Sequence, residues 1–125
     1  LYATPDYVKK IGTPSKPAQL SRADFINIDS GYGYKDVLNT LGFGLTEANF
    51  PLETRNFLVM WELVKTGLGI GILDSIIGDM ESRVIRVLPS MKPLIFPIWL
   101  VAHRELSASR RIRFVYDLLA RELAH

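Results

Sequence analysis

Three neighbouring side chains, Thr54, Arg55 and Asn56, have the types and the position of a small-molecule binding site. They stand between a predicted strand, residues 50–54, and the most apolar predicted helix, residues 56–66. Ligands of open α/β sheets bind outside the carboxyl ends of strands. Free backbone N–H groups at a helix start attract anions, and the three side chains add donors. The alternative is that Asn56 only caps the helix and Arg55 is solvated, and the pattern leaves both interpretations open.

Thr4 follows the same logic at another junction. Residues 1–3 are typical of a strand end, and Pro5 opens a predicted helix directly after Thr4. Pro is preorganised for the first helical position, and a threonine before it is a good N-cap. A plain cap is therefore the simpler interpretation of Thr4, with ligand binding as the second.

Catalytic and metal chemistry find little support among the residues. The chain has no cysteine and two histidines, one of which is the terminal residue. The other, His103, ends a predicted strand, where a surface position explains it better than a role as a general base. Asp74, Asp79 and Glu81 fit helix capping around residues 75–80 at least as well as a metal site. We therefore expect no catalytic residue, no metal and no cofactor.

Gly67, Gly69 and Gly71 invite a dinucleotide-binding interpretation, which fails on position. The Gly-x-Gly-x-x-Gly fingerprint leads from a strand into a helix, whereas these glycines follow a helix and enter a strand. We expect them to end the helix and to let the strand pack closely.

Strands and helices alternate along the chain, which indicates an α/β fold with a mostly parallel sheet flanked by helices. The predicted helices cover residues 5–11, 34–41, 56–66 and 75–80, and a final segment capped by Ser107 or Ser109. The predicted strands cover residues 24–29, 50–54, 68–73, 83–88 and 94–103. The final helix has one apolar stripe, formed by Ile112, Val115, Tyr116, Leu119 and Leu123.

Composition excludes several classes of protein. The 125 residues suffice for one ordinary domain, and contents of 48% hydrophobic and 22% charged residues are normal for a globular protein. No apolar run approaches the roughly 18 residues that a membrane span needs. The formal net charge is +2, and the only basic cluster is Arg110, Arg111 and Arg113, so no groove for nucleic acid is expected.

Several segments match one family pattern in order and spacing. They are residues 1–8 (LYATPDYV), 12–14 (GTP), 17–20 (PAQL), 62–73 (ELVKTGLGIGIL), 86–89 (RVLP), 97–101 (PIWLV) and 107–119 (SASRRIRFVYDLL). Together they resemble the LysR-type transcriptional regulators of bacteria. The chain departs from that family at Asp74, where proline is frequent, and over residues 31–49.

The resemblance implies an effector-binding domain built like a type II periplasmic binding protein. Two α/β lobes then enclose a cleft for an anionic or polar small molecule. Residues 1–96 correspond to the second lobe, and residues 97–125 to a return strand and a C-terminal helix that pack on the first lobe. DNA is contacted only through a winged helix-turn-helix outside this chain. The resemblance further implies a cytoplasmic homo-oligomer without enzymatic activity or membrane contact.

On this resemblance the effector site carries over to strand ends. Its members are Thr4, Thr54, Arg55 and Asn56, with Asp29 and Ser30 as weaker candidates at the end of the strand predicted over residues 24–29. A periplasmic solute-binding protein of the same architecture is the alternative, and an enzyme on the same scaffold ranks third. The start at Leu1 predicts a processed chain or a piece of a longer protein.

Overall fold

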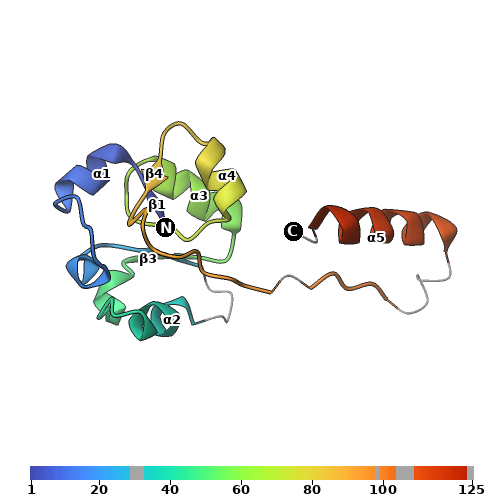
Figure 1. Ribbon diagram of the computed structural model, residues 1–125, viewed down its shortest axis with the longest axis horizontal. Helices are drawn as coiled ribbons and strands as arrows, with labels where there is room; N and C mark the ends of the chain where they lie inside the picture. Colours follow the sequence, from blue (N-terminus) through green and yellow to red (C-terminus); the bar gives the residue numbers. More distant parts are fainter. Residues whose placement is uncertain (29–32, 98, 104–108, 124–125) are drawn as a thin grey trace. The chain divides into compact units, whose positions relative to one another are not determined.

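The computed structural model describes residues 1–28, 33–97, 99–103 and 109–123. The chain divides into two compact units, residues 1–93 and residues 94–125 (Figure 1). All strands of the described residues belong to the first unit.

Each helix predicted for the first unit is present among the described residues. They are α1 (Pro5–Lys10), α2 (Tyr34–Thr40), α3 (Phe57–Lys65) and α4 (Ser75–Met80), with 3₁₀ turns η1 (Pro17–Leu20) and η2 (Glu47–Asn49) between them. The side chain of Thr4 caps α1, and the side chain of Asn56 caps α3. Local capping chemistry therefore sets where these helices begin, as the sequence predicts.

The strands are short and form a mixed arrangement. They are β1 (Tyr2–Ala3), β2 (Ile26–Ile28), β3 (Leu52–Thr54) and β4 (Ile85–Arg86). The pair β1–β4 is antiparallel and the pair β2–β3 is parallel. Residues 70 and 71 link the two pairs, through an antiparallel bridge from Gly71 to Tyr2 and a parallel bridge from Ile70 to Phe25. The strand order is therefore β4, β1, residues 70–71, β2, β3.

The α/β class is confirmed, but the sheet is not the mostly parallel one expected. Both neighbours of β1 run against it. Alternation of strands and helices predicts the order of elements along the chain, and it carries no information on the direction of β1. Its partners come from more than half the chain length away, so no local turn signal marks the antiparallel pairing.

One core cluster lies between α3 and one face of these strands. Tyr2, Ile26, Met60, Trp61 and Val64 are buried there with Val84. Burying an aliphatic side chain of this size stabilises by roughly 1.5–3 kcal/mol.

The surroundings of Gly71 show why the strand at residues 70–71 contains glycine. A Cβ at this position would lie 2.5 Å from Val64 Cγ2 and 2.9 Å from Met60 Sδ. The strand approaches α3 too closely for any side chain, so the close-packing interpretation of these glycines is confirmed.

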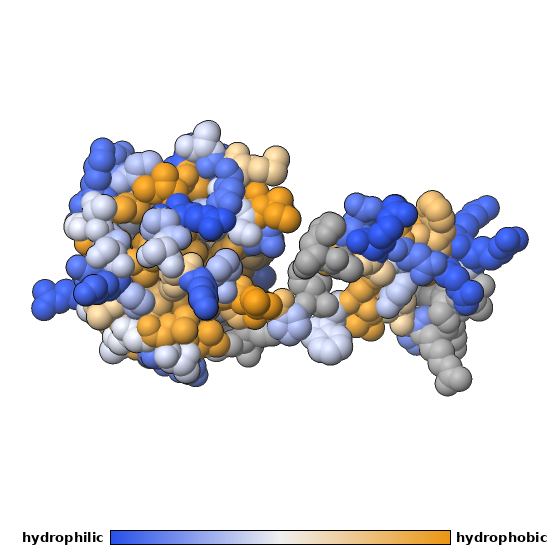
Figure 2. All heavy atoms as spheres, viewed as in Figure 1, coloured by the Kyte–Doolittle hydropathy of each residue, from blue (hydrophilic) through white to orange (hydrophobic). Residues whose placement is uncertain are grey.

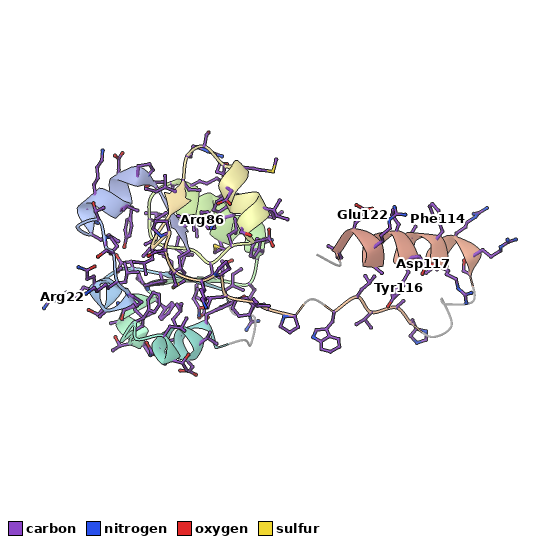
Figure 3. The ribbon with its side chains drawn as sticks, viewed as in Figure 1. Arg22, Arg86, Phe114, Tyr116, Asp117 and Glu122 are labelled. Carbon is purple, nitrogen blue, oxygen red and sulfur yellow. The ribbon has the colours of Figure 1, made fainter. Side chains whose placement is uncertain are left out.

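The second unit contains α5 (Arg110–Leu123). The Ser109 carbonyl accepts a 2.9 Å hydrogen bond from the Arg113 N–H, which places Ser109 at the N-cap position, whereas Ser107 lies outside the described residues. Apolar side chains of α5 remain exposed, and hydrophobic surface is visible on this unit in Figure 2. Phe114 and Tyr116 project from opposite sides of the helix (Figure 3).

The strand predicted over residues 94–103 is not formed by the described residues in that range. A strand needs a neighbour for its backbone hydrogen bonds. In this segment the Leu100 carbonyl instead accepts a 3.2 Å hydrogen bond from the Tyr116 hydroxyl. Among the described residues, no helix has the length and apolar character required to cross a membrane.

Candidate functional site

The carboxyl ends of several strands meet at one edge of the first unit. Ile70 pairs in parallel with Phe25, and β2 pairs in parallel with β3, so these three strands run in one direction. Ile28, Thr54 and Ile72 mark their carboxyl ends, and we call this side of the sheet the carboxyl edge.

The carboxyl edge contains a topological switch point. From β2 the chain continues to β3 on one side, whereas from residues 70–71 it continues to α4 and β4 on the other side. Neighbouring strands whose connections diverge leave a crevice outside their carboxyl ends, where ligands of α/β sheets bind.

A shallow, open hollow lies at this switch point, and we call it the apolar hollow. Its lining residues are Phe25, Ile26, Asn27, Ile28, Tyr34, Phe50, Met60 and Ile72. None of these side chains carries a formal charge at neutral pH. The hollow is therefore lined mainly by apolar and aromatic residues.

Thr54, Arg55 and Asn56 are brought to the carboxyl edge, as expected. Asn56 Oδ1 accepts hydrogen bonds from the N–H groups of Leu58 (2.9 Å) and Val59 (3.2 Å). The Asn56 N–H donates to Thr54 Oγ1 at 3.1 Å. The backbone donors that we expected to be free for an anion are thus largely used by the chain's own side chains.

Side-chain donors, rather than free backbone N–H groups, are available at the junction of β3 and α3. Thr54 Oγ1 is an acceptor in its bond to Asn56, so its own O–H is available to donate. Asn56 Nδ2 has no hydrogen bond within the described part of the chain, and it carries two N–H donors. Arg55 is exposed and adds a positive charge. The junction favours a ligand that accepts hydrogen bonds.

The structure separates Thr4 from these residues. Because β1 runs against residues 70–71, its carboxyl end lies at the opposite edge of the sheet. Thr4 Oγ1 accepts a 3.3 Å hydrogen bond from the Tyr7 N–H, and a Cβ on Gly67 would lie 3.0 Å from it. Thr4 is therefore the cap of α1. Asp29 and Ser30 lie outside the described residues.

Asn27, Tyr34 and Ile72 were not expected at the site. Asn27 Nδ2 donates a 2.7 Å hydrogen bond to Glu53 Oε2 across the β2–β3 pair. A polar residue between two isoleucines of a strand was the one available signal. Ile72 and Tyr34 are brought there by tertiary structure, which residue spacing does not encode.

The acidic residues around α4 have structural partners. Asp74 Oδ1 accepts a 2.8 Å hydrogen bond from the Ile76 N–H and caps α4, as predicted. Arg86 lies beside Asp79 and lowers the pKa of that carboxyl to about 2, with help from the Tyr2 hydroxyl. Arg83 likewise lowers the pKa of Glu81 to about 2. Within the described residues, no group of three metal-ligating side chains is present.

An α/β unit with donors and an apolar hollow at its switch point has the architecture of a small-molecule binding lobe. The chain matches the family model described as LysR substrate binding domain over residues 1–124. It therefore belongs to this family, the C-terminal effector-binding domain of LysR-type transcriptional regulators. No curated protein and no solved structure gives a significant match.

Proposed function

We propose that this chain senses an effector for a LysR-type regulator and that the effector binds at the carboxyl edge. The observation that carries the proposal is the position of Thr54 and Asn56. Their donors lie at the end of β3, next to the switch point where the apolar hollow opens. The effector accepts hydrogen bonds and is anionic or polar, because the Thr54 hydroxyl and Asn56 Nδ2 are donors.

The effector acts through differential affinity for two arrangements of the protein. A ligand changes a conformational equilibrium only as far as it binds one state more tightly. In the intact regulator, the effector closes a cleft between this lobe and a first lobe. The closure shifts the geometry of an oligomer whose winged helix-turn-helix domains contact DNA. The family match favours this role over that of a periplasmic solute-binding protein.

The test uses an arginine pair at opposite ends of the parallel strands. Arg55 follows β3 at the carboxyl edge, whereas Arg22 precedes β2 and is also exposed (Figure 3). Small carboxylates and polar metabolites are screened for a rise in the melting temperature of the chain. For each compound that stabilises it, Arg55→Ala is expected to weaken binding roughly tenfold, the loss of one charge-assisted contact.

Arg22→Ala is the matched control and is expected to leave binding unchanged. Equal binding by wild type and Arg55→Ala would remove the assignment of the carboxyl edge as the effector site.

A further inference from the structure

One side of α5 is apolar and is not covered by its own unit. No residue of this helix is buried within the described part of the chain. The Tyr116 hydroxyl donates to the Leu100 carbonyl at 3.2 Å, so the neighbouring segment of this unit lies on the Tyr116 side. Phe114, which is 71% exposed, and Glu122 project from the side away from Tyr116 (Figure 3). A contiguous exposed face of large apolar side chains is uncommon on a monomer and marks an interaction surface.

The exposed side chains follow helical spacing, and we call this surface the α5 face. Its members are Arg111, Phe114, Val115, Leu118, Leu119 and Glu122. Positions 111, 115, 118 and 122 run along its middle in steps of four, three and four residues. This is the spacing of the seam between two packed helices. The face therefore has one charge at each end and apolar side chains between them.

The α5 face is complementary to itself when a second copy runs in the opposite direction. A two-fold axis between positions 116 and 117 brings each end of one helix to the opposite end of the other. The pairs that it creates are Arg111 with Glu122, Phe114 with Leu119, and Val115 with Leu118. A parallel arrangement would instead place Arg111 against Arg111 and Glu122 against Glu122. The charge pattern therefore favours an antiparallel second copy, whose symmetry makes every pair twice.

We propose that two copies of this chain associate through the α5 face, as an antiparallel helix pair with Val115 and Leu118 at its centre. At both ends the Arg111 guanidinium of one copy pairs with the Glu122 carboxylate of the other. In the single chain Glu122 accepts hydrogen bonds of 3.1 and 3.0 Å from its neighbour Arg121, an exposed ion pair that contributes little and exchanges readily. A helix of this length extends about 21 Å. The interface is therefore small, and we expect a dissociation constant of roughly 100 µM.

Charge swaps test the pairing by sedimentation velocity of the chain at about 50 mM salt, where exposed charges are weakly screened. The sedimentation coefficient of the wild type is expected to rise between about 5 and 500 µM protein. Arg111→Glu opposes two carboxylates at both ends, and Glu122→Arg opposes two guanidinium groups. Each single variant is therefore expected to dimerise at least about tenfold more weakly.

Arg110→Glu is the matched control for these swaps. It makes the same change of charge one position away, which is about 100° further round the helix and off the α5 face. We expect this variant to dimerise as the wild type does.

Mixing the two single variants tests the register directly. In the mixed pair the glutamate introduced at position 111 meets the arginine introduced at position 122, and the unchanged Arg111 and Glu122 meet at the other end. We therefore expect the mixture to dimerise with wild-type affinity. This rescue does not depend on a separate test of folding, because an unfolded helix cannot pair.

Three results would overturn the proposal. A wild-type chain that stays monomeric over the whole range has no second copy on the α5 face, which leaves the first lobe expected from the family resemblance as its partner. Weak single variants without rescue in the mixture would remove the antiparallel register. If the wild type dimerises and no charge swap changes its affinity, the copies associate through another surface.

Discussion

The Tyr2 hydroxyl donates a 2.7 Å hydrogen bond to Asp79 Oδ1, which joins β1 to α4 across 77 positions of the chain. Arg86 on β4 donates to the same carboxylate through both Nε and a terminal nitrogen. The Tyr2 ring packs so closely on Gly78 that an added Cβ would lie 2.3 Å from Tyr2 Cζ. Three elements that the sequence keeps far apart are therefore held together at one buried tyrosine.

Removing the Tyr2 hydroxyl tests the hydrogen bond apart from the ring. Tyr2→Phe keeps the packing on Gly78 and leaves the Asp79 carboxylate with one donor fewer. We expect the melting temperature to fall by roughly 2–6 °C, as for the loss of one such bond in a domain of this size. Calorimetry measures the shift. Tyr116→Phe, whose hydroxyl makes one exposed bond to Leu100, serves as the control and is expected to change it less. An unchanged melting temperature in Tyr2→Phe would mean that ring packing alone holds Tyr2.

Asp79 also predicts how stability responds to acid. Its pKa is lowered from the ordinary 3.8 to about 2, chiefly by the hydrogen bonds from Arg86 and then by the one from Tyr2. A lowered pKa means that the folded state favours the ionised carboxylate. This contribution to stability is therefore complete above about pH 4 and is lost as the pH falls through about 2.

Asp79→Asn isolates this contribution. The variant is expected to unfold at lower urea than wild type at neutral pH. The difference in urea midpoint between wild type and Asp79→Asn is expected to narrow from about pH 4 down to about pH 2. The reason is that the wild-type Asp79 carboxylate becomes protonated in this range and loses the charge that the variant lacks. Urea titrations followed by circular dichroism measure it. A gap that stays constant over this range would show that Asp79 contributes through packing and not through its charge.

Gly71 tests the close approach of the strand to α3. Gly71→Ala puts a Cβ 2.5 Å from Val64 Cγ2, and we expect a loss of about 1–3 kcal/mol in the free energy of unfolding. Val64→Ala removes the clashing methyl groups. The double variant is therefore expected to be more stable than the sum of the two single losses predicts. Chemical denaturation of all four proteins gives the coupling, and strict additivity would contradict the clash.

Local sequence signals predicted where the helices begin better than how the strands pair in the sheet. Thr4 and Asn56 marked the starts of α1 and α3 because a cap acts on the next few residues of the same chain. The direction of β1 depends on pairing with Gly71 and Arg86, and nothing near β1 records it. That direction decides the site. It moves Thr4 to the edge opposite Thr54, although both stand at a strand-to-helix junction. Ile72 likewise lines the hollow because of strand pairing: the bridge from Ile70 to Phe25 places its segment beside β2.

Asn56 has two roles that one pair of substitutions separates. Its Oδ1 caps α3, and its Nδ2 is a donor of the proposed site. Asn56→Ala removes both and is expected to cost about 1 kcal/mol of stability, the usual value of an N-cap. Asn56→Asp keeps the capping oxygen and places a negative charge at the positive end of the helix, so stability is expected to be equal or slightly higher. The aspartate no longer donates and repels a carboxylate, so binding of any carboxylate that stabilises the wild type is expected to be lost in this stable variant. Melting curves and NMR titration with that carboxylate measure the two roles independently. Binding by Asn56→Asp at the wild-type affinity would confine Asn56 to the cap and leave Thr54 and Arg55 as the proposed contacts.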